Sequence, residues 1–269
     1  MTAAAPDRLR ALVARALENS DTSAANAASV AQALVAAEID GQKGHGLSRV
    51  ASYAAQARSG KVNGRAVPRL SQPRPAALVV DAADGFAFPA IDLAIERLAA
   101  LTPETGVAAA AIHHSHHFGV AGRHVERLAG HGLVALAFGN SPKAIAPWGG
   151  KAAIFGTNPI AFAAPRANAP ALVIDLSLSK VARGRIMVAA QKGEKIPAGW
   201  ALDRDGAPTT DAKAALDGAM LPLGDAKGAA LALMVEILAA ALTASHIGTE
   251  ASTFFTPEGP PPRVGQLQQ

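Results

Sequence analysis

Cysteine is absent from the 269 residues, and large aromatic side chains are scarce, with two Trp and one Tyr. The lack of cysteine excludes disulfide bonds, catalytic thiolates and metal sites with cysteine ligands. Half of the chain is apolar. The core must therefore be built from Val, Ile, Leu and Ala, as packed α/β proteins often are. At this length it can fill one large domain or two connected ones.

Long apolar runs are missing as well. The longest candidate for a membrane span, Gly228 to Ala244, is shorter than the roughly 20 residues that a bilayer requires and carries Glu236 in its middle. It predicts a buried helix instead. The first part of the chain does not combine a basic start with an apolar run, so we predict no secretory signal. We expect a cytoplasmic protein with no membrane partner.

Clusters of positive charge are absent, although the net charge is +4 and the pI is near 9.6. Lys and Arg are scattered along the chain, and almost no aromatic residues accompany them, so we predict no nucleic-acid partner. A mild positive field favours small anionic substrates.

The first 75 residues predict a helical domain. An amphipathic pattern opens at Pro6, Ser23 can cap a second helix that runs towards Ile39, and a third helix is expected from about Leu47 to Arg58. The Pro- and Arg-rich stretch Lys61 to Pro75 predicts an extended linker.

Residues 76–269 predict an α/β domain, because strand-like and helix-like runs alternate. The expected strands are Ala77–Asp81, Gly106–Ile112, Gly132–Phe138, Ile160–Ala164 and Ala171–Leu176. The expected helices are Pro89–Leu101, Val120–Leu128 and Lys180–Gln191. This order favours a mixed or mostly parallel sheet. The tail from Gly259 is expected to have no room for another element.

Several familiar motifs are absent. The chain has no G-x-G-x-x-G after its first strand and no G-x-x-x-x-G-K-[ST], so a nicotinamide cofactor would bind without a Rossmann loop. It also has no G-x-S-x-G and no H-E-x-x-H, which leaves serine-hydrolase and zinc-protease interpretations without support.

His45 stands between Gly44 and Gly46 at the junction of two predicted helices, and Arg49 follows one turn later. The glycines allow a ligand to approach the backbone closely. A histidine that delivers a proton beside an arginine that grips a carboxylate is what reduction of a 2-oxo acid needs. The alternative is a helix-linking turn with an exposed histidine, and the residues alone leave both open.

His113-His-Ser-His-His117 follows a predicted strand, and Phe118 and Gly119 lead into a helix. A metal site is one interpretation. However, no carboxylate lies in the segment, and adjacent histidines on an extended chain point to opposite faces. We therefore expect no metal here and favour a contact with substrate or cofactor at the edge of the sheet.

Two further segments suit ligand binding. Asn140 to Gly150 and Phe155 to Pro159 form a loop rich in Pro, Gly, hydroxyls and amides. Asp175 to Ser179 lies at a strand end, where the Asp175 carboxylate can accept from ribose hydroxyls or cap the helix that follows.

Together these segments resemble the malate/L-lactate dehydrogenase family, whose nicotinamide-binding fold is not of the Rossmann type and which includes sulfolactate dehydrogenases and Δ1-pyrroline/Δ1-piperideine-2-carboxylate reductases. The resemblance extends from about Asp7 to Gln266. Its motifs are Gly44-His45-Gly46 with Arg49, His117-Phe-Gly119, Asn140-Ser-Pro to Gly150, Phe155 to Pro159, Asp175-Leu-Ser with Val181 to Gly184, Gly199 to Asp203 and Pro222 to Gly228.

The resemblance implies an NAD- or NADP-dependent reductase of a small 2-oxo acid or a cyclic imine carboxylate, acting as a homodimer. It implies that His45 donates the proton and that Arg49 and Thr157 bind substrate. The residues implied to meet the cofactor are His117, Phe118, Gly119, Ser141, Asp175, Leu176, Ser177 and Lys227.

The chain departs from the family pattern in three respects. Gly44 replaces the Ser that usually precedes the catalytic histidine. Arg185 stands where imine-reducing members with a Ser-His-Asp relay have an acidic residue, so His45 is expected to act largely alone. Relatives also continue past Gly-Gln-Leu, so the second domain is expected to be shortened. The alternative function is a catalytically silent binding homologue.

Overall fold

The computed structural model of the protein describes residues 5–269. It begins with the helices α1 (Pro6–Glu18), α2 (Ala24–Ile39) and α3 (Val50–Arg58). The Ser23 hydroxyl accepts a hydrogen bond from the N–H of Asn26, so it caps α2 as predicted. Between α2 and α3 lie two 3-10 turns, η1 (Lys43–His45) and η2 (Leu47–Arg49).

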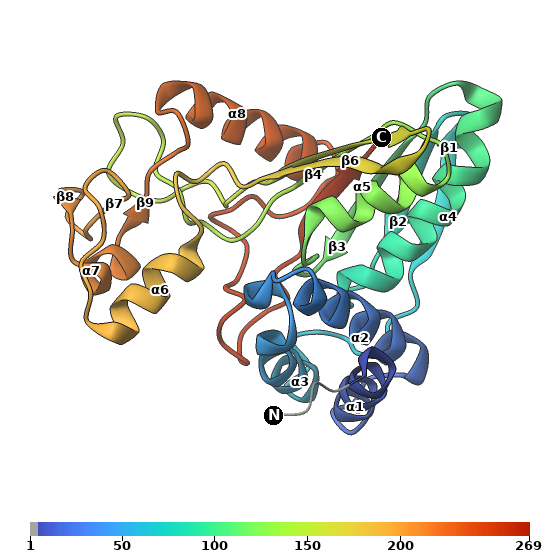
Figure 1. Cartoon of the computed structure of the whole chain (residues 1–269), viewed down its shortest axis with the longest axis horizontal. Coiled ribbons are helices and arrows are strands. Elements are labelled where there is room, and N and C mark those ends of the chain that lie inside the picture. Colours follow the sequence, from blue (N-terminus) through green and yellow to red (C-terminus); the bar gives the residue numbers. More distant parts are fainter. Residues whose placement is uncertain (1–4) are drawn as a thin grey trace.

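A seven-stranded sheet in the order β1-β2-β3-β10-β4-β5-β6 forms the body of the molecule (Figure 1). Only β2 and β3 are parallel, and the other neighbouring pairs are antiparallel. The mixed sheet is therefore confirmed, but a mostly parallel one is not formed. Its strands are β1 (Arg69–Arg74), β2 (Ala77–Asp81), β3 (Ala109–Ser115), β4 (Ala135–Gly139), β5 (Ile160–Arg166), β6 (Ala169–Leu176) and β10 (Val264–Gln268).

Helices cover both faces of this sheet. Alternate residues of a strand point to opposite faces, so Ala110 and Ile112 of β3 pack with α4 (Ala87–Thr105) and α5 (Ala121–Gly130). Ala109 and Ala111 of β3 join the cluster of α8 (Ala226–Glu236) and its π-helical continuation η3 (Ile237–Ala241) on the other face. The helices α1 to α3 bury a third cluster with Phe86 and Phe88.

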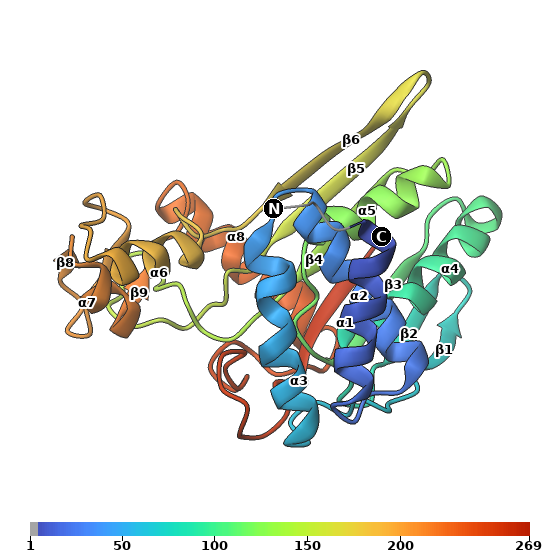
Figure 2. The same ribbon diagram turned by 60° about the horizontal axis from the view of Figure 1, so that its bottom comes forward.

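A small lobe stands apart from the sheet on the left of Figure 1. It contains α6 (Arg183–Lys192), β7 (Ala201–Leu202), β8 (Pro208–Thr209), α7 (Ala212–Asp217) and β9 (Ala219–Met220). Its strands form a second sheet in the order β8-β7-β9. These strands are two residues long, too short to show an alternating pattern in the sequence. The β5–β6 hairpin projects from the body in another direction (Figure 2).

The prediction that nothing follows Gly259 is wrong. β10 lies in the centre of the main sheet, between β3 and β4, and all five of its residues are buried. Two glutamines and a glycine in the sequence VGQLQ hide the strand, because it has no apolar run and only one β-branched residue, Val264. Its burial comes from the two strands and the helices around it.

The predicted linker Lys61–Pro75 is also wrong over its second half. Arg69 to Arg74 pair with β2 as the edge strand of the sheet, with an irregularity between Ser71 and Arg74. An edge strand tolerates Pro73 because one of its sides needs no ladder hydrogen bonds. The domain proposed for residues 1–75 thus contributes a strand to the sheet of the domain proposed for residues 76–269.

The helix predicted to be buried over Gly228–Ala244 is buried on one face only. Ala232, Val235 and Ala239 are buried, whereas Leu233 and Ile237 are 50% and 53% exposed. Within residues 5–269, no helix has both the length and the apolar character needed to cross a membrane.

Candidate active site

His45 and His117 meet although 72 positions separate them in the chain. His45 ends the turn η1 after α2, and His117 follows β3 closely. Nδ1 of His45 lies 3.1 Å from Nε2 of His117, and the rings are nearly parallel and meet edge to edge, with their centroids 5.1 Å apart and an angle of 5° between their planes. Two residues that the sequence singled out separately are therefore one unit.

Tyr53 joins this pair of histidines through a hydrogen bond to His117. Its hydroxyl, on the fully buried side of α3, lies 2.5 Å from Nδ1 of His117. Phe254 closes the other side of the His117 ring, with 5.3 Å between the ring centroids. The result is a hydrogen-bonded chain Tyr53–His117–His45, so the expectation that His45 acts largely alone does not describe this arrangement.

The chain can run in two directions. If Tyr53 donates to His117, then Nε2 of His117 donates to Nδ1 of His45, and the hydrogen of a neutral His45 lies on Nε2. If His45 donates through Nδ1, its Nε2 carries a free lone pair. Reversing the chain switches the outer nitrogen of His45 between donor and acceptor without a change in net charge.

Burial sets the protonation of these groups. Burial, and then the positive charge of Arg49, lower the pKa of His45 to about 4. The same two causes hold the pKa of His117 well below its ordinary value. Burial raises the pKa of Tyr53, so the phenol keeps its proton. At neutral pH the unit is uncharged, and Tyr53 orients the histidines without acting as an anion.

Two guanidinium groups stand at one aromatic ring near His45. The Arg49 guanidinium carbon is 5.3 Å from the centroid of Phe255, and that of Arg183, from the small lobe, is 5.9 Å from it. Both are favourable cation–π distances. Nε of Arg49 donates to the carbonyl of Gly44 over 2.7 Å, which fixes the side chain next to His45. Burial lowers the pKa of Arg183.

The group that closely approaches the backbone at Gly46 is a side chain of the protein itself. A Cβ on this residue would lie 2.4 Å from Oε2 of Glu38, and the same oxygen accepts from the N–H of Leu47. The glycine therefore admits the Glu38 carboxylate to the turn that carries His45, and not a ligand.

A second group of predicted residues also converges. The N–H of Thr157 donates to the Ser141 hydroxyl over 3.0 Å, and the two hydroxyls are 3.3 Å apart. The carbonyl of Thr157 accepts from Leu178, the residue after Ser177. An isolated β-bridge between Ser179 and Pro222 joins this region to the segment that carries the exposed Lys227.

The remaining predicted residues occupy different environments. Oδ2 of Asp175 accepts from the N–H of Gly122 over 2.7 Å. The carboxylate therefore caps α5, and not the helix that follows it in sequence. Phe118 is 5% exposed in the core of the sheet, whereas Leu176 is 47% exposed. Gly119 adopts a φ of +73° in the turn before α5.

This donor set fits a nicotinamide dinucleotide. The hydroxyls of Ser141 and Ser177 can bind ribose and phosphate oxygens, and the ammonium of Lys227 can pair with a phosphate. Thr157, which is expected to bind substrate, lies beside Ser141. The hydroxyls are partly buried on loops that hydrogen bonds hold in place. No Rossmann loop is required for such contacts.

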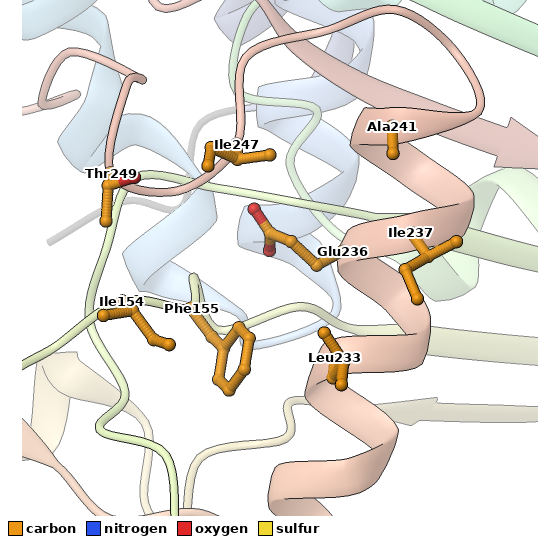
Figure 3. A pocket seen from close by; sticks show the side chains of 8 residues that line it. All are labelled: Ile154, Phe155, Leu233, Glu236, Ile237, Ala241, Ile247 and Thr249. Atoms are coloured by element: carbon orange, nitrogen blue, oxygen red, sulfur yellow. The ribbon is translucent and has the colours of Figure 1, made fainter. Parts of the chain in front are cut away.

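Glu236 of α8 holds the loops that carry Asn158 and Gly248 by hydrogen bonds. It is buried, and its carboxylate accepts from the side chain of Asn158 over 2.6 Å and from the N–H of Gly248 over 2.5 Å. It points into a cavity of about 390 Å³ between α8 and the loops at Phe155 and Ile247 (Figure 3). His45 does not line this cavity. The candidate active site is placed at His45 because the groups able to transfer a proton and bind an anion are there.

Sequence reasoning missed Tyr53, Arg183, Phe255 and Glu236 as members of the site. Two of them carried a signal: Tyr53 is the only tyrosine of the chain, and Glu236 is the one carboxylate in a long apolar run. Arg183 lies within the motif Val181 to Gly184, which gave it no role of its own, and Phe255 carried no signal. Both reach the site from segments far away in the sequence.

Known proteins resemble this chain over most of its length. The profile of a family described as malate/L-lactate dehydrogenase matches residues 4–269. A (2R)-3-sulfolactate dehydrogenase (NADP(+)) from Chromohalobacter salexigens is 60% identical over 88% of this chain and 71% of its own length.

A Δ1-pyrroline-2-carboxylate/Δ1-piperideine-2-carboxylate reductase from Pseudomonas putida is 43% identical over 96% of this chain and 76% of its own. Among solved structures, the Δ1-piperideine-2-carboxylate reductase from Pseudomonas syringae pvar. tomato superposes with a TM-score of 0.95 at 39% identity. That superposition covers 100% of this chain and 81% of the other.

Proposed function

The chain belongs to the malate/L-lactate dehydrogenase family, and from that premise we propose that it interconverts a small dianionic 2-hydroxy acid and its 2-oxo acid with NADP(H). At the coarser level it is an NAD(P)-dependent oxidoreductase of small 2-oxo acids or cyclic imines. The observation that carries the finer proposal is the pair of guanidinium groups, Arg49 and Arg183, at the ring of Phe255.

A pair of cations suits a substrate with two anionic groups. One guanidinium can bind the carboxylate bidentately, and the other can bind a second acidic group on the neighbouring carbon. Sulfolactate, the substrate in the name of a relative that is 60% identical, carries a carboxylate and a sulfonate. A cyclic imine carboxylate carries one carboxylate only and leaves the second guanidinium without a partner.

His45 is the group that transfers the proton. A bound nicotinamide cofactor supplies or accepts the hydride at C2 of the substrate. The alkoxide that forms on reduction needs a proton, and the outer nitrogen of a protonated His45 can deliver it, which leaves a neutral imidazole whose Nδ1 stays bonded to His117. In the oxidative direction the same nitrogen, with its lone pair free, accepts the proton of the hydroxyl.

Substrate binding changes the acidity of His45. Arg49 is one of the two causes of its lowered pKa, and a carboxylate bound to Arg49 cancels that positive charge. The pKa of His45 then rises, so binding of the anion favours protonation of His45, and reduction consumes this proton. The free enzyme keeps His45 neutral and ready to act as a base.

The cofactor would lie along Ser141, Ser177 and Lys227, and Thr157, whose hydroxyl is 3.3 Å from that of Ser141, would meet the substrate. We propose NADP over NAD on the strength of the 60% identical relative, which is named as NADP(+)-dependent. Lys227 is a cation on this surface that could meet a 2′-phosphate.

A substrate panel tests the proposal. The purified protein is assayed with NADPH and NADH against sulfopyruvate, oxaloacetate, pyruvate and Δ1-pyrroline-2-carboxylate. We expect the highest kcat/KM with a dianionic oxo acid and NADPH. Turnover confined to the cyclic imine contradicts the dianion proposal, and no turnover together with no NADPH fluorescence change supports the silent homologue.

Arg183→Gln separates the roles of the two cations. We expect KM for the dianionic substrate to rise by about tenfold to a hundredfold, since a charge-assisted contact contributes roughly 1.5–3 kcal/mol. KM for pyruvate, a monoanion, should change little. Arg185→Gln is the matched control, because this neighbouring arginine is exposed and makes no contact with Phe255. Equal effects on both substrates contradict the assignment.

We also propose that the protein is a cytoplasmic homodimer. The edge strand β6 exposes Leu172, Ile174 and Leu176 on the projecting hairpin (Figure 2). An apolar, unpaired edge favours association with another chain. Light scattering during size-exclusion chromatography tests the dimer, and Leu172→Lys should weaken it.

A further inference from the structure

A second cluster of chemistry-bearing side chains lies outside the candidate active site. Asp81 ends β2, and the parallel register places it beside His113 on β3. His114 is the next residue. The ligand atoms of these three side chains all lie within 4.8 Å of one another. The cluster joins residues that are more than thirty positions apart, so sequence spacing does not reveal it.

The two imidazoles share a side of the strand because His114 departs from regular strand geometry. Its φ of +47° lies in the left-handed region, which is uncommon for a residue other than glycine. Adjacent side chains of a regular strand point to opposite faces. Here the ring centroids of His113 and His114 are 4.4 Å apart. The expectation that adjacent histidines point to opposite faces is therefore wrong for this pair.

The cluster holds a carboxylate and two imidazoles whose nitrogen atoms are not all used. Nδ1 of His114 lies 3.0 Å from Oδ1 of Asp81. Nδ1 of His113 is buried and has no hydrogen-bond partner in the part of the chain that the structure describes. A buried polar atom without a partner is uncommon in folded proteins and points to a missing ligand.

We propose that Asp81, His113 and His114 bind a divalent late transition-metal ion of the Zn²⁺ type. Two imidazoles and one carboxylate are a known ligand set for such ions, with bond lengths of about 2.0–2.2 Å. A tetrahedral ion keeps its ligand atoms roughly 3.4 Å apart at that bond length, so small side-chain rotations complete the site. Nitrogen ligands disfavour Mg²⁺ and Ca²⁺, which take oxygen ligands.

The ion would tie together β2 and β3, next to the segment that leads into β10. Ala82 and Asp84 already donate backbone hydrogen bonds to the carbonyls of His113 and His114. Asp84 in turn pairs with Arg263, at 2.9 Å from each of two guanidinium nitrogens, just before β10. Metal binding would therefore stabilise the junction of β2, β3 and β10. The ion would have a structural role and would take no part in the reaction at His45.

Calorimetric titration of the whole protein with Zn²⁺ alone, after treatment with a chelator, tests the site. We expect one ion per chain and a higher melting temperature with Zn²⁺, since a ligand that binds the native state stabilises it. Mg²⁺ and Ca²⁺ should do neither. No saturable binding of Zn²⁺ overturns the proposal.

Variants locate the ion. His114→Ala and Asp81→Asn should each weaken Zn²⁺ binding by about 100-fold and abolish the Zn²⁺-dependent rise in melting temperature. Asp81→Asn keeps the shape of the side chain, so the site can still be tested with this variant if His114→Ala does not fold. His131→Ala, which removes an exposed histidine elsewhere, is the control and should bind as the wild type does. Unchanged binding in Asp81→Asn overturns the site.

Discussion

Tyr53 and His117 give His45 a fixed orientation that a surface histidine would lack. The bond between Tyr53 and His117 is buried, and the hydrogen bond between His117 and Nδ1 of His45 leaves one imidazole nitrogen of His45 for chemistry. The three side chains therefore form a positioning device for one nitrogen atom.

His45→Ala should lower kcat by about 10²–10⁴, the usual contribution of a general acid or base. Steady-state kinetics in both directions measure it. His131→Ala, at an exposed position, serves as the control and should leave kcat unchanged. Turnover at the wild-type rate in His45→Ala contradicts the assignment of the proton donor.

Tyr53→Phe removes only the hydroxyl that orients His117. We expect kcat to fall by roughly tenfold, the equivalent of losing one hydrogen bond of about 1.4 kcal/mol, while NADPH affinity stays the same. In the oxidative direction kcat/KM of the wild type should rise with pH through about 4, where His45 loses its proton. A shift of this limb in Tyr53→Phe distinguishes positioning from simple loss of packing.

The single residues that sequence reasoning found are those inside ordered motifs. His45, Arg49 and Thr157 lie in such motifs, and so do His117 and Ser141, the hydrogen-bond partners of His45 and Thr157. Tyr53 and Phe255 do not. Phe255, from a late loop, packs against the guanidinium of Arg49, and Arg183 reaches the same ring from the small lobe. A contact between segments so far apart depends on the tertiary fold, so no local spacing predicts it.

The strand β10 is the element on which the sheet depends most. It supplies the hydrogen bonds between β3 and β4, and without it these two strands would not touch. Helices and strands with strong local patterns, such as α2 and β2, were predictable to within a residue or two. β1 and β10 were not, because their pairing partners define them and their own side chains do not.

Gly265→Ala tests how tightly β10 is enclosed. A Cβ at this position would lie 1.9 Å from the carbonyl oxygen of Ala239, a backbone atom that cannot rotate away. We expect a loss of roughly 3 kcal/mol or more in unfolding free energy, measured by urea denaturation, as for other overpacked cores. Gly130→Ala, where a Cβ would meet nothing within 4 Å, is the control and should be neutral or slightly stabilising.

At the scale of the whole molecule, neutral buried histidines limit stability in acid. Burial is the largest cause that lowers the pKa of His124 to about 4 and of His117 well below its ordinary value. The unfolded chain titrates near 6.5. Because the folded pKa is the lower one, the stabilisation is complete above pH 6.5 and is lost as the pH falls towards 4.

The free energy of unfolding should therefore be flat from pH 8 to 7 and fall by on the order of 2 kcal/mol per buried histidine at pH 5. Urea denaturation at a series of pH values, at constant ionic strength, measures this. His131→Ala should show the same profile as the wild type because this side chain is exposed. A stability that stays constant down to pH 4.5 contradicts the role of the buried histidines.

The central position of β10 also has a consequence for biosynthesis. β3 emerges from the ribosome roughly 150 residues before its partner β10, which corresponds to on the order of ten seconds of translation. During this interval the facing edges of β3 and β4 have no strand between them, and unpaired edges favour aggregation. Folding yield in the cell should therefore depend on protection of the nascent chain until β10 is made.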